Sequence, residues 1–231
     1  MTLSVRHLSK DYPTRGGPLA VLRDMSFDLD VGEALAVMGP SGSGKSTLLQ
    51  VIARVLTPTT GSVEVRGRVA PLLQLGAGFD MELSGRENVF LNGAILGRSR
   101  KEMKRRFPGI VEFAELDHFI DAPLRTYSTG MVARLGFAVA SDVEPDILLI
   151  DEVLSVGDLE FQRKCIGRIG EFLARGATLV LVSHSPESVL QLCQQVVWLE
   201  EGRVVADGPA REVVEAFVTR AISGAVRAAT G

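Results

Sequence analysis

The stretch Gly39-Pro40-Ser41-Gly42-Ser43-Gly44-Lys45-Ser46-Thr47 decides how the rest of this chain is organised. It follows an apolar run of strand length at 34–38 and precedes an apolar, helix-like segment at 48–53. This is the G-x-x-x-x-G-K-[ST] pattern of a phosphate-binding loop, in the strand–loop–helix order that the pattern requires. Glycines let the backbone approach a triphosphate closely, and the N–H groups at the helix start hold the anion. We therefore expect nucleotide binding, with Lys45 reaching the β- and γ-phosphates and the Ser46 hydroxyl binding Mg²⁺.

The composition is that of an ordinary globular protein. The chain has 231 residues, enough for one large or two small units, with 46% hydrophobic and 23% charged residues. Its net charge of −3 predicts no general attraction to nucleic acid or to an anionic membrane. No apolar run reaches the length of a membrane span, and the N-terminus lacks the apolar core of a signal peptide. Cys165 and Cys193 lie in apolar helical segments, which favours buried, reduced thiols in a cytosolic protein.

Two acidic residues follow the most apolar strand of the sequence. Residues 147–150 form an apolar run that leads directly into Asp151 and Glu152. Such a run is typical of a buried parallel strand, whose carboxyl end faces a ligand crevice. We expect Asp151 to hold Mg²⁺ and Glu152 to polarise the water that attacks the γ-phosphate. The alternative is a pair of strand-end acids without a ligand.

One of the three histidines has a functional context. His184 follows the apolar run 177–182, which predicts a strand that ends at the same sheet edge as Asp151. We expect it to contact the γ-phosphate. His7 and His118 lack such a context, and we expect structural or surface positions for them.

The remaining strand signals lie near the two ends of the chain. Residues 2–8 and 25–31 alternate in polarity as half-buried strands do, with a turn region at 13–18 between them. Tyr12 stands just before this turn, where its ring either stacks on an adenine base or is a surface tyrosine. Turn dipeptides predict two hairpins: 62–65 with 68–73, and 196–200 with 203–206.

Helical patterns fill most of the middle of the sequence. Ser84–Glu87 and Ser99–Glu102 have the composition of capping boxes at helix starts. We expect helices at 84–96, 99–107, 110–114, 132–140 and 210–221. The helix expected at 99–107 carries a basic run: Arg98, Arg100, Lys101, Lys104, Arg105 and Arg106. This run is either a solvated surface or a contact to anionic head groups or to an anionic substrate.

A second anion-binding helix start is predicted at 127–131, which reads Tyr-Ser-Thr-Gly-Met. Ser128 and Gly130 precede an apolar helix, whose free N–H groups favour an anion. Many helix starts have this composition, so the segment alone is weak support for a site.

Taken together, these motifs resemble those of an ABC transporter ATPase subunit. The phosphate loop, Gln74, the segment 127–131, the acidic strand end, the segment 155–158 and His184 occur in the family's order. The resemblance covers nearly the whole chain. It implies that Tyr12 stacks on adenine, and that Gln74 senses Mg²⁺ and the attacking water.

The resemblance also implies an assembly. Two copies of the chain bind two ATP molecules head to tail, each ATP lying between one phosphate loop and the partner's signature residues Ser128 and Gly130. Asp158 corresponds to an interface aspartate. A polytopic membrane subunit docks near residues 76–97, which implies a location on the cytoplasmic face of the cell membrane.

Departures from the usual signature indicate a subfamily. Tyr127, Thr129 and Met131 replace the usual Leu, Gly and Gln, and only 29 residues (74 − 45) separate Lys45 from Gln74. These features resemble exporters of lipid-linked polysaccharides of the O-antigen, capsule and teichoic acid types. The alternatives are an ATPase for another lipid or drug, and a soluble ABC ATPase acting on DNA or ribosomes. A soluble ABC ATPase of that kind usually has basic surfaces and a long coiled-coil insertion, and this sequence shows neither.

The expected fold is α/β. It comprises a phosphate-loop NTPase (RecA-like) core with an antiparallel β subdomain at 1–76 and 142–231, and an inserted helical subdomain at 77–141. The expected cofactors are ATP and Mg²⁺, and the expected partners are a second copy of the chain and the membrane subunit, without nucleic acid.

Overall fold

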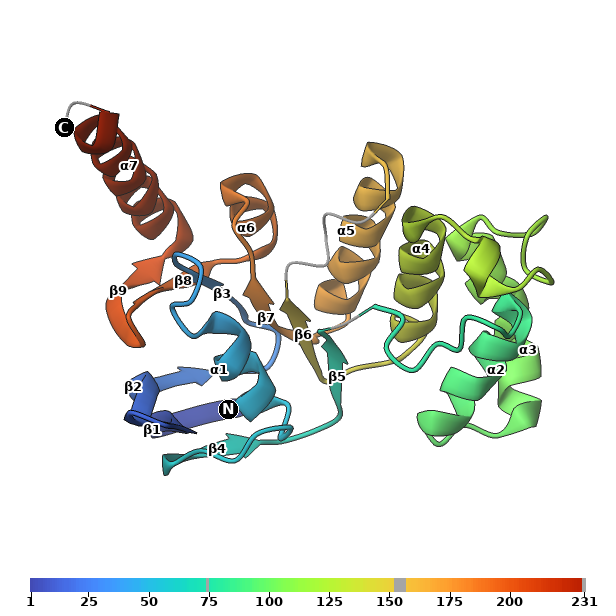
Figure 1. Ribbon diagram of the computed structural model, residues 1–231, viewed down its shortest axis with the longest axis horizontal. Coiled ribbons are helices and arrows are strands. Elements are labelled where there is room, and N and C mark those ends of the chain that lie inside the picture. The colour runs from blue at the N-terminus through green and yellow to red at the C-terminus, as the bar shows by residue number, and fades with distance from the viewer. Residues whose placement is uncertain (74, 152–156, 230–231) are drawn as a thin grey trace. The chain divides into compact units, whose positions relative to one another are not determined.

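The structure, a computed structural model, describes residues 1–73, 75–151 and 157–229 (Figure 1). The chain divides into two compact units. The first comprises Met1–Pro71, Pro145–Glu152 and Phe172–Gly231, and the second comprises Leu72–Glu144 and Val153–Glu171. The second unit therefore includes the segment 77–141 that was expected to be helical.

A six-stranded sheet forms the centre of the first unit. In spatial order it contains β5 (Val69–Leu72), β6 (Ile147–Asp151), β7 (Thr178–Val182), β3 (Ala34–Met38), β8 (Gln195–Glu200) and β9 (Arg203–Pro209). The neighbours from β6 to β8 are parallel, and β9 pairs antiparallel with β8 as the second hairpin prediction required. All residues of β3 and β7 are buried, because apolar side chains point to both covered faces.

A three-stranded antiparallel sheet lies beside it in the same unit. Its strands are β2 (Gly17–Leu29), β1 (Leu3–Thr14) and β4 (Thr60–Val65). The strands β1 and β2 are longer than the expected 2–8 and 25–31. Their pairing continues through Pro13 opposite Pro18 to the pair Thr14 and Gly17, so the predicted turn region shortens to two residues.

The predicted hairpin between 62–65 and 68–73 is wrong. β4 pairs with β1, whereas β5 lies next to β6 in the other sheet. The chain changes sheets at Gly67, whose φ is +102° and whose backbone packs on the Asp146 side chain. The Asp146 carboxylate accepts a hydrogen bond from the Arg68 N–H at 2.6 Å. A local turn signal cannot reveal such a competing partner almost eighty residues away.

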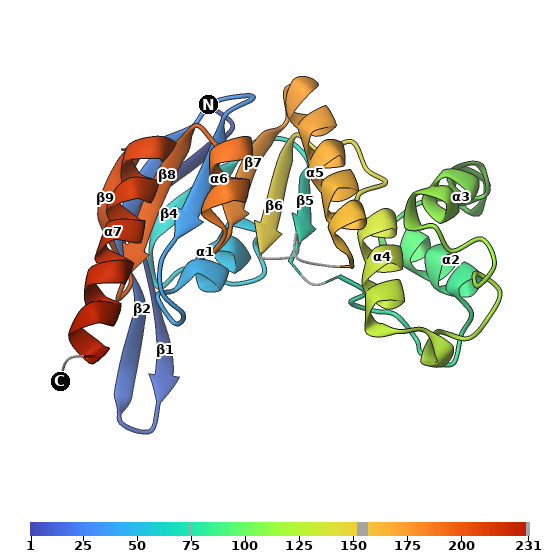
Figure 2. The ribbon, with the colours of Figure 1, turned by 90° about the horizontal axis from the view of Figure 1, so that it is seen from above.

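The helix α1 (Lys45–Ile52) contacts both sheets, touching β6 and β7 of one and β2 and β4 of the other. Leu48, Leu49 and Ile52 have no exposed surface there. On the other face of the large sheet lie α6 (Pro186–Leu192) and α7 (Ala210–Ala229), which contact each other (Figures 1 and 2). α7 extends beyond its expected end near Ala221. No described helix is sufficiently long and apolar for a membrane span.

The second unit is helical. It contains α2 (Gly85–Ile95), α3 (Arg100–Ala114), the 3-10 helix η1 (Leu124–Thr126), α4 (Thr129–Ala140) and most of α5 (Leu159–Ala174). The Ser84–Glu87 capping box is present with both of its hydrogen bonds. At the second predicted box only the Ser99 cap forms, and Glu102 pairs with Arg106 instead. The two helices expected at 99–107 and 110–114 are one helix, which contains Pro108.

Three phenylalanines from three helices form an aromatic cluster in this unit. Phe113 and Phe137 stack with ring centroids 5.8 Å apart, and Phe161 meets both rings edge-on at 5.8 and 6.3 Å. Phe137 and Phe161 are fully buried. Because the cluster joins α3, α4 and α5, it fixes the helix that begins at Thr129.

Both cysteines are buried and unpaired, as expected. Burial raises the pKa of the Cys165 and Cys193 thiols to about 12. Both thiols therefore remain protonated at neutral pH and are poor nucleophiles.

The phosphate loop depends on glycines at two crowded positions. Gly44 has a φ of +104°, and a Cβ there would lie 2.7 Å from the Val21 carbonyl oxygen. A Cβ on Gly39 would lie 2.0 Å from the Leu199 carbonyl oxygen. Gly42 also has a positive φ, +80°, but open space surrounds it. The loop therefore packs tightly on the backbone at its two ends and is open at its centre.

We expect Phe137→Ala to destabilise the second unit by about 3–5 kcal/mol, because the substitution leaves a cavity inside the aromatic cluster. Phe119, which is 52% exposed in the same unit, provides the matched control. Phe119→Ala should change the free energy of unfolding by less than about 0.5 kcal/mol. Urea unfolding followed by circular dichroism measures both values, and equal losses would contradict the assigned core.

We expect Gly42→Ala to cost about 1–2 kcal/mol of stability, because alanine is strained at a left-handed backbone conformation. Gly44→Ala should cost at least about 1 kcal/mol more, because its Cβ also collides with a backbone carbonyl. The difference between the two midpoints of urea unfolding is the relevant measurement. Equal midpoints would show that the backbone contact of Gly44 is not as close as described.

Candidate functional site

The register of the parallel strands brings the predicted catalytic segments to one sheet edge. Val182, at the end of β7, pairs with Val37 on one side and Asp151 on the other. The phosphate loop begins two residues after Val37, and His184 lies two residues after Val182. The segments of the loop, Asp151 and His184 therefore all emerge at the carboxyl edge of the sheet, where open α/β sheets bind ligands.

The phosphate loop lines a hollow of about 300 Å³. Its lining residues are Val21, Ser41, Gly42, Gly44, Lys45, Ser46, Thr47 and His184. Seven of these eight were singled out from the sequence, and the fold brings His184 to the loop from a separate strand. The hollow therefore combines a hydroxyl, an ammonium and an imidazole group.

Backbone carbonyl groups of the loop hold the Lys45 side chain in place. Lys45 is only 5% exposed, and its Nζ donates hydrogen bonds of 2.9 Å to the carbonyl oxygens of Gly39 and Pro40. A buried ammonium group requires such partners, because isolated charges are costly to bury. These hydrogen bonds position the side chain at the hollow.

Backbone donors complete the hollow. α1 begins at Lys45 directly after Gly44, so the N–H groups of its first turn have no acceptor inside the helix. Among the described residues, the buried Ser43 Oγ also has no hydrogen-bond partner. Several polar donors, one ammonium group and a helix N-terminus together suit the phosphates of a nucleotide.

Val21 is a lining residue that sequence reasoning missed. Lys10 pairs with Leu22 and Asp11 pairs with Ala20, so Val21 is the extra residue of a β-bulge in β2. Bulges redirect side chains next to binding sites. The strand pattern alone gave no signal for this bulge, because it depends on the register against β1.

Tyr12 lies on β1 and pairs with Leu19. Its ring is half-buried, and Lys10 Nζ lies 5.4 Å from the ring centroid. The described residues that line the phosphate hollow do not include Tyr12. A contact between this ring and adenine therefore stays a prediction.

Two of the four predicted catalytic residues, Gln74 and Glu152, lie outside the described residues. Asp151 is half-buried at the end of β6. Their predicted roles, and that of Asp151 as a metal ligand, stay predictions.

A second hollow, of about 460 Å³, lies within the second unit at the start of α4. It is lined by Ser128, Gly130, Met131, Arg134, Gly157 and Asp158. The three residues predicted for the dimer interface are thus brought together. Ser128 caps α4, its hydroxyl accepting a hydrogen bond from the Met131 N–H at 3.2 Å.

Arg134 links the two sides of this hollow and was not identified from the sequence. Its guanidinium group donates to Asp158 and, at 2.9 Å, to Glu115, and it lies over the Phe161 ring. The Phe161 backbone N–H and then the Arg134 guanidinium lower the pKa of Asp158. Arg134 follows Gly130 by four residues, so helical periodicity places both on one face.

The unusual Tyr127 of the signature has a structural role. It is 8% exposed, and its hydroxyl donates a 2.6 Å hydrogen bond to the Phe119 carbonyl oxygen. Burial raises the pKa of this hydroxyl. The same hydroxyl would lie 2.5 Å from a Cβ on Gly85, so Gly85 makes room for it. The tyrosine therefore fixes the segment that precedes Ser128.

Sequence comparisons give several close matches to this chain. The ABC transporter family model matches residues 22–155. The O-antigen export system ATP-binding protein RfbB of Klebsiella pneumoniae is 50% identical over 203 residues, covering 88% of this chain and 82% of that protein. The teichoic acids export ATP-binding protein TagH of Listeria innocua is 42% identical over 196 residues, covering 85% of this chain and 58% of that protein.

Solved structures share the fold. The ATP-binding subunit of an ABC transporter superposes with a TM-score of 0.80 at 27% identity, covering 94% of this chain and 93% of that chain. A dimeric ATP-binding cassette bound to ADP and phosphate gives the same TM-score at 24% identity, covering 90% and 99%. These matches confirm the predicted α/β phosphate-loop fold. The family model matches more than half of the chain, and RfbB, which is 50% identical, is covered over 82% of its length. This chain therefore belongs to the ABC transporter family.

Proposed function

We propose that this chain is the ATP-hydrolysing subunit of an exporter that moves a lipid-linked polysaccharide across the cytoplasmic membrane. The observation that carries the proposal is the phosphate hollow, in which Lys45, Ser46 and His184 meet at the carboxyl edge of a parallel sheet. The substrate class rests on the relatives, which are named for O-antigen and teichoic acid export.

The phosphates of ATP would lie along the loop 39–47. Lys45 would neutralise the β- and γ-phosphates, and the first-turn N–H groups of α1 would bind the same anion. Ser46, Asp151 and Gln74 would hold Mg²⁺, which supplies further charge neutralisation when bound. A small number of protein ligands is sufficient for Mg²⁺, because this ion keeps several water ligands and also binds phosphate oxygens.

Hydrolysis requires little covalent chemistry from the protein. Glu152 would orient the attacking water, Gln74 would sense it, and His184 would contact the γ-phosphate. Catalysis then comes from positioning and from stabilisation of the charge on the transferred phosphoryl group.

The site would be completed by a second copy of the chain. Ser128 and Gly130 lie at the N-terminal end of α4, which favours an anion. They line the same hollow as Asp158. In the proposed head-to-tail dimer, these residues contact the γ-phosphate bound to the partner. Tyr12 would stack on the adenine base of its own ATP.

The membrane subunit would dock near residues 76–97. This segment exposes large apolar side chains: Met81 is 45% and Leu91 is 37% exposed. Exposed apolar side chains that gather in a patch are typical of interaction surfaces. This docking would place the chain on the cytoplasmic face of the membrane.

We expect Glu152→Gln to form a stable dimer in the presence of ATP and Mg²⁺, because ATP binds but its hydrolysis stops. Gel filtration with and without ATP measures the shift. Ser128→Arg in the Glu152→Gln background is the control, since a bulky cation should block the partner's contact and keep the protein monomeric. A Glu152→Gln protein that binds ATP normally but stays monomeric would contradict the shared site.

We expect cells without this gene to accumulate lipid-linked polysaccharide internally and to lose it from the surface. The wild-type gene should restore export, whereas Glu152→Gln should not. Extraction of lipid-linked glycans and surface labelling provide the two readouts. Unchanged glycan with an altered sensitivity to drugs would instead favour another transported substrate.

A further inference from the structure

The basic run of α3 is divided into paired and unpaired cations. Arg98 and Arg106 form ion pairs with Asp142, and Arg106 also pairs with Glu102. The other four cations are exposed, and none forms an ion pair with another described residue: Arg100, Lys101, Lys104 and Arg105. We call these four the basic stripe. Their spacing of one and four residues places them on one side of the helix.

The basic stripe is unfavourable for the helix that carries it. Arg100 and Lys101 occupy the first turn of α3, where the helix dipole favours acidic side chains. Arg100 with Lys104, and Lys101 with Arg105, are like-charge pairs at a spacing that destabilises helices. The whole chain is acidic, with a net charge of −3, so general composition does not account for the stripe. An external anion would relieve this repulsion.

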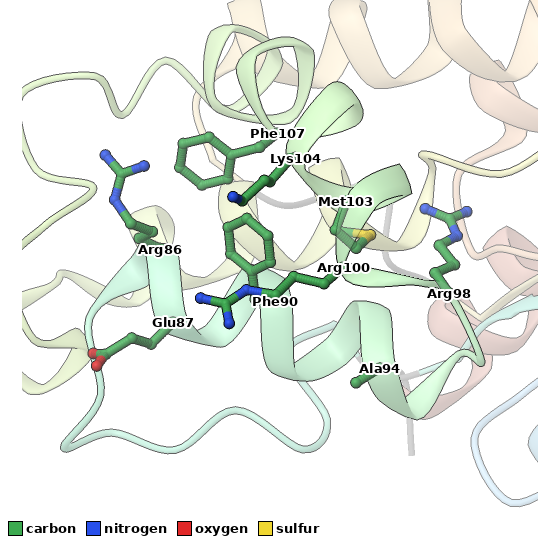
Figure 3. A pocket seen from close by; sticks show the side chains of 9 residues that line it. All are labelled: Arg86, Glu87, Phe90, Ala94, Arg98, Arg100, Met103, Lys104 and Phe107. Atoms are coloured by element: carbon green, nitrogen blue, oxygen red, sulfur yellow. The ribbon is translucent and has the colours of Figure 1, made fainter.

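An apolar groove lies beside the stripe, between α2 and α3 (Figure 3). Phe90 and Phe107 stack within it at a centroid distance of 5.6 Å, and Ala94 and Met103 also line it. Arg100 and Lys104 of the stripe extend over the same groove. The groove has a volume of about 580 Å³ and offers apolar contact and positive charge at one place. The Glu87 carboxylate also lines it and accepts hydrogen bonds from Ser84.

The C-terminal end of α2 adds exposed apolar surface. Ile95 is 65% exposed and Leu96 is 54% exposed, and they precede Arg100 by only five and four residues. Apolar side chains next to clustered Lys and Arg are typical of segments that lie in the interface of an anionic membrane.

We propose that the α2–α3 face binds the surface of an anionic phospholipid bilayer. The basic stripe pairs with lipid phosphates, while Ile95, Leu96 and the groove contact the acyl boundary. A bilayer presents phosphate and hydrocarbon together, which matches both halves of this face. The inference rests on the proposed function in one respect, because a transport role brings the chain to a membrane.

The test is co-sedimentation of the 231-residue chain with vesicles of phosphatidylglycerol and phosphatidylcholine, compared with phosphatidylcholine alone. We expect wild-type protein to sediment with the anionic vesicles and to be released by high salt. Each cation near an anionic surface contributes roughly a fivefold factor in binding. Replacement of all four stripe residues by glutamine should therefore weaken binding on the order of several hundredfold.

A matched variant replaces by glutamine four exposed arginines of the first unit that form no ion pair with another described residue: Arg66, Arg175, Arg203 and Arg211. It changes the net charge equally and should sediment like wild type. Ile95→Ser with Leu96→Ser should weaken binding at low salt, where wild-type protein sediments with the anionic vesicles. The stripe variant should bind ATP normally and unfold at an equal or higher temperature, because it loses internal repulsion.

Equal binding by the stripe variant and the matched variant would overturn the proposal. A wild-type chain that stays in the supernatant at low salt would also overturn it and would favour an acidic protein segment as the occupant. ATP hydrolysis by the same samples separates the two proposals. Vesicle binding without hydrolysis would contradict only the ATPase function, and hydrolysis without vesicle binding only the membrane face.

Discussion

The first unit depends on close backbone contacts that only glycine permits. Gly39 approaches the Leu199 carbonyl, and both Gly44 and Gly202 approach the Val21 carbonyl. These contacts join the phosphate loop, the bulge of β2 and the β8–β9 turn at one place. The Gly202 N–H also donates to the Ser43 carbonyl oxygen at 3.2 Å. The loop is therefore held before any ligand arrives, which reduces the entropic cost of binding.

This rigid support explains the position of the charged groups. α1 is fixed between two sheets by fully buried leucine and isoleucine side chains, so the direction of its N-terminus is set by the core. Two loop carbonyl groups accept hydrogen bonds from the nearly buried Lys45 ammonium group. Because packing rather than the ligand positions these groups, the hollow is preorganised for phosphate.

Ion pairs between side chains of different segments organise the hollow of the second unit. Lys164 pairs with Glu115, Glu115 with Arg134, and Arg134 with Asp158, which connects α5 to the start of α4. The Lys164 ammonium and the Arg134 guanidinium lower the pKa of Glu115, so this carboxylate remains ionised well below neutral pH. Such half-exposed pairs contribute little stability singly, and their consequence here is a fixed geometry around Ser128.

The sequence by itself determined the phosphate loop, the parallel strands that end in Asp151 and His184, and the helix starts at Ser84 and Ser128. Each of these depends on local chemistry: glycine conformations, apolar runs and side-chain caps.

Only the tertiary structure decided the partner of each strand, which is why the hairpin predicted around Gly67 was wrong. The same holds for the Val21 bulge and for Arg134, whose importance arises from Asp158 and Glu115 on other segments. The tertiary structure also divided the cations in and just before α3, since Arg98 and Arg106 pair with Asp142 while the basic stripe faces solvent. Local pattern specifies an element, but contacts between distant residues decide its neighbours and therefore the composition of each site.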